Sequence, residues 1–164
     1  MLVLLSILAL LSIALAAPTP TNAASATTTT CHALIEQTPW TISNLTAFDA
    51  APGYNGSYVS FHFCDVNDGL ELETDCSRYL PKGSSRSPID PATYYDCGSN
   101  EVRFIYAGSS LIIERSFVDD CLGPVPYNSA IAYGTEDTNV ANTTSLAGDT
   151  CTQAEMFVKI TKES

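Results

Sequence analysis

The stretch "YYDCGSNEVRFIYAGSSLIIERSFVDDC", residues 94–121, decides the fold because apolar and polar residues alternate on both sides of a short turn. Val102, Phe104 and Tyr106 fall on one face of an extended chain, since successive side chains of a β-strand point to opposite sides. "AGSS" then turns the chain, "LIIERSFV" returns, and a cysteine stands near each end. The pattern predicts a β-hairpin that is fixed by cysteines at both ends and serves as scaffold.

The same alternation recurs elsewhere in the chain. Val59, Phe61 and Phe63 face one way, with polar residues between them, and Asp68-Gly69 then supplies the pair that a tight hairpin turn requires. Helical spacing is nowhere sustained over a dozen residues, and residues 79–93 are typical of a long polar loop. The sequence therefore predicts an all-β fold, a compact antiparallel β-barrel or sandwich stapled by disulfides. Further runs that predict strands are "WTIS" (40–43), "LELET" (70–74), "SAIAY" (129–133) and "EMFVKIT" (155–161).

The first residues predict the compartment. "LVLLSILALLSIAL" has the length of a signal-peptide apolar region, and the small residues Ala14 and Ala16 favour cleavage after residue 16. An uncleaved anchor is the alternative, because no Lys or Arg precedes the run. Residues 17–30 are rich in Thr, Pro, Ala and Ser and predict a disordered spacer. We expect a secreted, extracellular protein with a signal peptide over 1–16 and a single all-β domain over 31–162.

The net charge of −11 and the pI near 4.2 restrict the partners. Seven basic residues scattered among 18 acidic ones make no patch that could follow phosphates, which argues against nucleic acid. The same charge disfavours an anionic membrane once the signal is removed. It suits a basic partner, or it simply keeps a secreted protein in solution.

No motif for catalysis, a cofactor or a metal emerges from the sequence. In an oxidising compartment six cysteines predict disulfides, and His32 and His62 are too few to complete an ordinary zinc site. His62 lies within a predicted strand, and Asp119 and Asp120 are neighbours that point to opposite faces, so they would not flank one glycosidic bond. We expect no enzymatic activity and no cofactor.

Three N-x-S/T sequons predict glycan acceptors at Asn44, Asn55 and Asn142. Asn55 is flanked by Tyr54 and Gly56 in a stretch that suggests a turn. A secreted protein meets the glycosylating enzymes, so the sequence predicts a glycoprotein.

Several elements in a fixed order resemble a known family. The chain resembles the secreted fungal proteins typified by the major allergen of Alternaria. The resemblance implies a compact antiparallel β-barrel-like fold, no established catalytic residues, and activity as an allergen or effector that binds host extracellular molecules, either a protein or a small molecule. The elements that carry it are Cys31, "WTIS" (40–43), "SYVSFHF" (57–63), "DCSR" (75–78), "YYDCGSNEVRF" (94–104), "LIIERSFVDD" (111–120) and "TCTQAEMFVKI" (150–160).

The resemblance also implies cysteine roles. By position, Cys76 and Cys97 match the family's central disulfide, and Cys31 lies where some members form an interchain bond, which would give a homodimer. The chain departs from the pattern at Cys64 and Cys121, and near its C-terminal strand it has only Cys151. Three pairings of the other four cysteines remain open. Pairing 121 with 151 and 31 with 64 is preferred because none is left free, and pairing 31 with 121 and 64 with 151 is the main alternative.

These observations together predict a secreted, non-catalytic binding protein of the effector or allergen type. A secreted hydrolase of cell-wall carbohydrate is one alternative, and two carboxylates converging in one pocket would favour it. A structural protein of the cell surface is another, consistent with the Thr-rich spacer.

Overall fold

The fold is that of a computed structural model, which describes residues 31–54, 56–84 and 86–164. The predicted signal peptide (1–16), the spacer (17–30) and the acceptor Asn55 lie outside the described residues. Cys31–Ser164 forms one compact unit, two residues longer than the predicted domain because Ser164 pairs with Ile131 through two backbone hydrogen bonds. In this unit no helix is long and apolar enough to cross a membrane.

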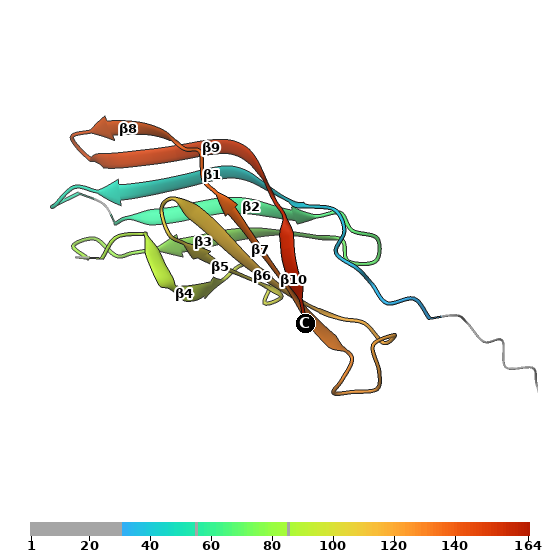
Figure 1. The fold of residues 1–164 in the computed structure, drawn as a ribbon. Coiled ribbons are helices and arrows are strands. Elements are labelled where there is room, and N and C mark those ends of the chain that lie inside the picture. Colours follow the sequence, from blue (N-terminus) through green and yellow to red (C-terminus); the bar gives the residue numbers. More distant parts are fainter. Residues whose placement is uncertain (1–30, 55, 85) are drawn as a thin grey trace, which may run out of the picture. The chain divides into compact units, whose positions relative to one another are not determined.

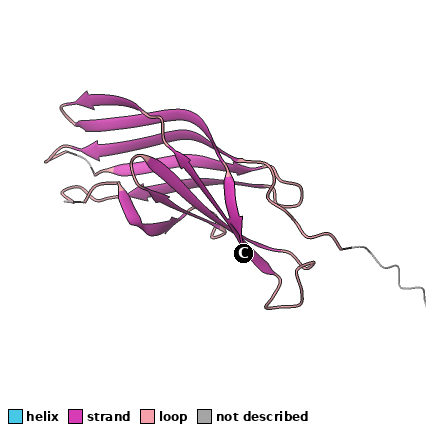
Figure 2. Cartoon of the chain, viewed as in Figure 1, coloured by secondary structure: helices cyan, strands magenta, loops and turns pink. Residues whose placement is uncertain are grey.

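Two five-stranded antiparallel sheets make up this unit, as Figure 1 shows. The first sheet has, in spatial order, β3 (Leu72–Tyr79), β2 (Tyr58–Asp65), β1 (Trp40–Ala50), β9 (Gly148–Val158) and β8 (Ala141–Ser145). The second has β10 (Ile160–Glu163), β7 (Ser129–Asp137), β6 (Ser110–Val118), β5 (Val102–Tyr106) and β4 (Asp90–Asp96). The predicted all-β class is confirmed, and the sheets form a sandwich rather than a closed barrel (Figure 2).

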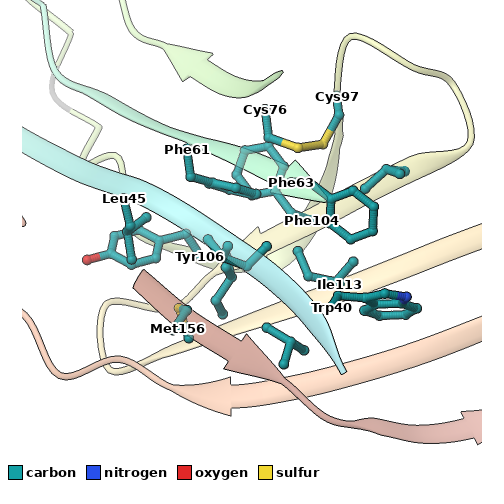
Figure 3. Close-up of a cluster of buried hydrophobic side chains, with 14 of the residues drawn as sticks. Trp40, Leu45, Phe61, Phe63, Cys76, Cys97, Phe104, Tyr106, Ile113 and Met156 are labelled. Atoms are coloured by element: carbon teal, nitrogen blue, oxygen red, sulfur yellow. A yellow bond between two sulfur atoms is a disulfide. The ribbon is translucent and has the colours of Figure 1, made fainter. Parts of the chain in front are cut away.

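The core fills the space between the sheets. Phe61 of β2 packs edge-to-face on Phe104 of β5, with ring centroids 4.9 Å apart and planes at 80°, a geometry worth about 0.5–1.5 kcal/mol beyond the buried area. The predicted inward direction of Val59, Phe61 and Phe63 is confirmed, since all three are buried. Figure 3 shows side chains from both sheets meeting in one cluster, among them Trp40, Leu45, Tyr106, Ile113 and Met156.

A bulge in β1 changes which residues face the core. Asn44 has φ of 57°, a left-handed conformation that Asn tolerates better than most residues, and the register with β2 shifts between Ser43 and Thr46. Strict alternation from Ile42 would bury Asn44. The bulge instead leaves Asn44 exposed and buries Leu45.

The final strand crosses from one sheet to the other. The sequence predicts one continuous strand over 155–161, but β9 ends at Val158 and the chain enters the second sheet as β10 at Ile160. The crossing packs against Gly134 of β7, where an added Cβ would lie 2.6 Å from Val158 and 2.8 Å from the Trp40 ring. That expectation was wrong because a period of two does not reveal which sheet a residue joins.

The hairpin of residues 94–121 is confirmed as β5, a turn, and β6. The loop expected over 79–93 is shorter, because Tyr79 still belongs to β3 and β4 begins at Asp90. β4 lies at the edge of its sheet and its register with β5 is irregular between Asp90 and Tyr95. An edge strand tolerates Pro91, which cannot donate to a ladder, and this hid the strand in the sequence.

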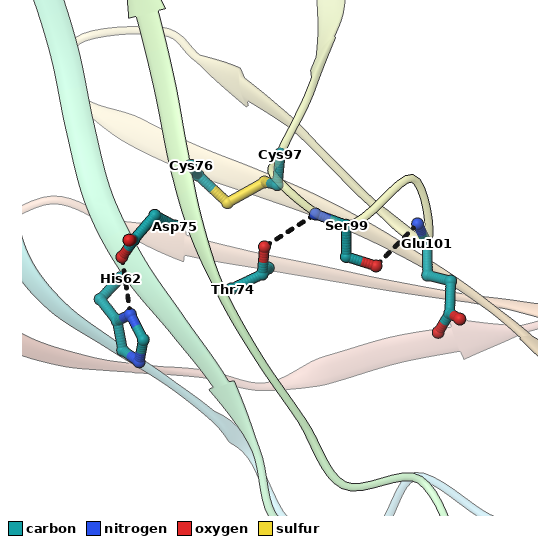
Figure 4. Close-up of a disulfide and its surroundings, with 7 residues drawn as sticks. All are labelled: His62, Thr74, Asp75, Cys76, Cys97, Ser99 and Glu101. Atoms are coloured by element: carbon teal, nitrogen blue, oxygen red, sulfur yellow. Dashed lines mark hydrogen bonds and ion pairs between the residues drawn. A yellow bond between two sulfur atoms is a disulfide. The ribbon is translucent and has the colours of Figure 1, made fainter.

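Two disulfides hold the sandwich. Cys76 is bonded to Cys97, as the resemblance implied, and the bond links β3 to the start of the hairpin (Figure 4). Beside it, Thr74 accepts a hydrogen bond of 2.8 Å from the Ser99 backbone. The second bond joins Cys31 to Cys121, with Cα atoms 5.4 Å apart.

The preferred pairings of Cys31 with Cys64 and of Cys121 with Cys151 are therefore wrong, and Cys64 and Cys151 are free. The alternative bond between Cys64 and Cys151 is absent for a geometric reason. Cys64 in β2 is paired with Thr41, and Cys151 in β9 is paired with Ala47 on the other side of β1. Thr41 and Ala47 are six residues apart along β1, which separates them by about 20 Å. A disulfide needs Cα atoms within about 7 Å.

Candidate binding site

Two cavities lie at the end of the sandwich where β1 leads into β2. Both are lined by Asp49, near the end of β1. The first, about 490 Å³, lies between the β1–β2 and β3–β4 loops. The second, about 390 Å³, lies where β8 and β9 meet the β3–β4 loop and the end of β5. The lining residues of the second cavity are Ala47, Asp49, Pro88, Ile89, Tyr106, Asn142, Thr144, Asp149 and Cys151.

Asp49 ties both loops to β1. Its Oδ1 accepts a hydrogen bond of 3.1 Å from the Ser57 hydroxyl, and its Oδ2 accepts one of 3.1 Å from the Ser87 hydroxyl. The Ser57 Oγ in turn accepts a hydrogen bond of 3.0 Å from the backbone N–H of Ala50. Because one carboxylate joins two loops distant in sequence, the walls of both cavities are held by the scaffold.

Turns in the two loops explain their local shape. Gly53 has φ of 90° and Gly83 has φ of 79°, conformations that glycine adopts without steric cost. The Tyr54 N–H bonds to the Ala51 carbonyl, and the Leu80 N–H bonds to the Ser57 carbonyl. The second bond fastens the loops to each other, so the rim of the first cavity is a hydrogen-bonded structure.

Asp49 and Asp149 face each other across the β1–β9 ladder and both line the second cavity. Like charges directly opposite on a sheet repel, so the pair favours a cationic group placed between or beside them. Among the described residues that line this cavity there is no Lys or Arg. It is therefore a negatively charged hollow with apolar walls from Pro88 and Ile89.

The thiol and the phenol in the second cavity stay protonated. Burial raises the pKa of Cys151, and the charges of Asp149 and Asp49 raise it further. Burial likewise raises the pKa of Tyr106, which is 2% exposed. A thiol of raised pKa is a poor nucleophile, and both groups offer hydrogen-bonding and packing surface to the cavity.

Of the residues that the sequence singled out and the structure describes, only Asn142 and Cys151 line these cavities. His62 is on the outer face of the first sheet, where its Nδ1 lies 2.8 Å from Asp75 Oδ1. Asp119 is buried and accepts a hydrogen bond from the Leu34 N–H, whereas Asp120 accepts one from Asn128.

Asn44 is exposed on the outer face of the first sheet, and Asn142 lines the second cavity. In the ranges that the structure describes, no three His, Cys, Asp or Glu side chains converge as metal ligands.

Sequence reasoning missed Asp49, Asp149 and Tyr106. They come from β1, β9 and β5, and the pairing of β1 with β9 joins residues about a hundred positions apart. No local motif marks the pair of Asp49 and Asp149, so only the order of the strands in the sheet reveals it.

The arrangement suits binding: a rigid scaffold presents two loop-walled cavities, one of them acidic and partly apolar. Its chemistry favours a ligand that carries a positive charge beside an apolar group. No protein-family model, no curated protein and no solved structure matches the chain.

Proposed function

We propose that the chain is a secreted, non-catalytic binding protein that holds an extracellular partner at the loop end of its sandwich. The observation that carries this proposal is the pair of cavities that share Asp49, because concave sites with apolar walls and a few converging polar groups are where proteins most often bind ligands. Two disulfides support an oxidising destination outside the cell. The resemblance to the fungal allergen group supports a host molecule as the partner.

The partner has a basic group that enters the second cavity. Asp49 and Asp149 supply the opposing charge, and the net charge of −11 steers a basic molecule toward the protein. Pro88 and Ile89 provide the apolar surface on which the stem of such a group packs. A basic side chain of a host extracellular protein or a small organic cation meets this description.

A carbohydrate hydrolase is the second candidate, because Asp49 and Asp149 converge on one cavity. Binding is favoured over hydrolysis on two grounds. Both oxygens of Asp49 already accept hydrogen bonds from serine hydroxyls. A general acid also needs an apolar, buried setting, and both carboxylates are exposed.

The test uses the mature chain and two charge-removing variants to capture ligands from host extracellular fluid. Asp149→Asn removes one carboxylate from the cavity, and Asp68→Asn removes an exposed one in the β2–β3 turn. Wild type and Asp68→Asn should bind the captured molecule alike, and Asp149→Asn should bind it at least about tenfold more weakly, the cost of one charge-assisted hydrogen bond. Equal binding by all three proteins would move the site elsewhere. Polysaccharide cleavage abolished by Asp149→Asn would establish the hydrolase.

A further inference from the structure

A groove of about 310 Å³ lies on the outer face of the first sheet, away from the two cavities of the proposed binding site. The groove runs across the strands, because Ser60 of β2 is paired with Ser77 of β3 on one side and with Thr46 of β1 on the other. These serines form the floor. The residues that line it are Asn44, Ser60, Phe61, His62, Asp75, Cys76, Ser77 and Tyr79.

Tyr79 lines one side of the groove and ends a row of aromatic rings on the same sheet face. Phe48, Tyr58 and Tyr79 are directly paired across β1, β2 and β3, with ring centroids 5.8 Å and 5.6 Å apart. Tyr79 is 69% exposed, so the residues that the structure describes leave the end of this row largely uncovered. An exposed ring backed by two half-buried ones is an apolar surface that a ligand can cover.

The opposite wall is polar. His62 and Asp75 are paired across β2 and β3, and the 2.8 Å hydrogen bond between them is visible in Figure 4. The carboxylate retains further lone pairs, and the second ring nitrogen, His62 Nε2, lies 3.9 Å from Glu73 Oε2, beyond hydrogen-bonding distance. Together with the serine hydroxyls, the groove offers hydrogen-bonding groups on one side and aromatic faces on the other. A pyranose ring has the matching character, with hydroxyl groups at its edge and an apolar C–H face.

Asn44 stands at the β1 end of this groove. It is the acceptor of the sequon Asn44-Leu45-Thr46, and the bulge in β1 holds it exposed on the groove side. Neighbouring strands lie about 4.8 Å apart, so β3 is about 10 Å from β1. Two linked pyranose rings span such a distance, which takes a chain attached at Asn44 across Ser60 to Ser77.

We propose that this groove is the seat of an N-linked glycan carried by Asn44. In the attachment step the Asn44 side-chain nitrogen bonds to C1 of the first sugar of a polyprenyl-diphosphate-linked oligosaccharide. The C1–O bond to the diphosphate breaks, the lipid diphosphate leaves with the electron pair, and the amide loses one proton. The first two sugars then lie across β2 and β3, with their C–H faces on Tyr58 and Tyr79. This proposal rests on the part of the proposed function that has the chain exported through a glycosylating compartment. It does not depend on which ligand occupies the loop-end cavities.

The test follows release of the glycan from folded protein. Wild type, Tyr79→Ser and the control Tyr127→Ser are produced in a secreting eukaryotic host, and peptide mass spectrometry measures occupancy at Asn44. Tyr127 is 75% exposed and lies in the β6–β7 loop, so its loss matches that of Tyr79 in kind without touching the groove. The rate of amidase release from Asn44 is then measured for native and denatured protein.

A seated glycan should be released from native wild type and from Tyr127→Ser about fivefold more slowly than from Tyr79→Ser, the effect of one lost aromatic contact. Denaturation should equalise the three rates. The glycan at Asn142, where present, serves as an internal reference whose release Tyr79→Ser leaves unchanged. An unoccupied Asn44 would overturn the proposal. Equal release from native wild type and native Tyr79→Ser would overturn it as well.

Discussion

At the scale of single residues, the clearest consequence concerns Glu36, in the segment before β1. Its Oε2 accepts hydrogen bonds from Trp40 Nε1 at 2.6 Å and from Asn67 Nδ2 at 2.9 Å. Burial, and after it the charge of neighbouring Asp65, raise the pKa of Glu36 from 4.5 to about 7, against the opposing effects of Trp40 and Arg115. The folded protein therefore keeps a proton on Glu36 that the unfolded chain has already released.

The stability that this proton confers is complete below pH 4.5 and is lost as the pH rises from 4.5 to about 7. A shift of this size corresponds to at most about 3–4 kcal/mol. Glu36→Gln retains an acceptor for Trp40 but does not titrate. Urea unfolding from pH 4 to 8 should show the variant gaining stability relative to wild type over this window. Exposed Glu71→Gln is the control, and a difference between Glu36→Gln and wild type that does not vary with pH would contradict the prediction.

At the scale of elements, Gly134 leaves the space in which the chain passes from β9 in the first sheet to β10 in the second. It lies in β7 opposite Ile113 on one side and Ile160 on the other, and the side chains of Val158 and Trp40 fill the place that a Cβ would take. Gly134→Ala should destabilise the protein by about 1–3 kcal/mol through overpacking, measured as a lower urea midpoint. Thr135→Ala, at an exposed position on the same strand, should change it little. An unchanged midpoint for Gly134→Ala would mean that the crossing moves aside freely.

Elements that bury one face were predictable from the sequence, and elements defined by their partners were not. Val59, Phe61 and Phe63 alternate because one side of β2 meets the core, so period two revealed the strand. β8 (Ala141–Ser145) has no large apolar residue and is exposed along its length, so its sequence resembles a loop. The carboxylate pair of the candidate site was hidden for a related reason, because a pairing between distant strands creates it.

At the scale of the whole molecule, the two disulfides connect segments that are far apart in the sequence, and the alternation of apolar and polar residues does not indicate these connections. Cys31 and Cys121 are 90 positions apart, and Cys76 and Cys97 are 21 apart. In the chain-entropy model such loops are worth about 4–5 and about 3 kcal/mol, respectively. From the sequence, Cys64 was the preferred partner of Cys31, because that set of pairings leaves no cysteine free. Spatial proximity decides instead, and it leaves Cys64 and Cys151 as thiols.

Exposure predicts the order in which the two bonds open. Cys76 and Cys97 are 1% and 8% exposed, whereas Cys31 is exposed and Cys121 half-buried. A thiolate must reach a sulfur atom in line to cleave the bond, so mild reductant should open Cys31–Cys121 in the folded protein. Cys76–Cys97 should open only when the sandwich unfolds.

Timed alkylation and peptide mapping should find Cys64 and Cys151 unpaired before reductant is added. Both thiols should alkylate slowly at neutral pH, because burial raises the pKa of each. Opening of Cys76–Cys97 first, or a peptide linking Cys64 to Cys151, would be incompatible with this arrangement of strands.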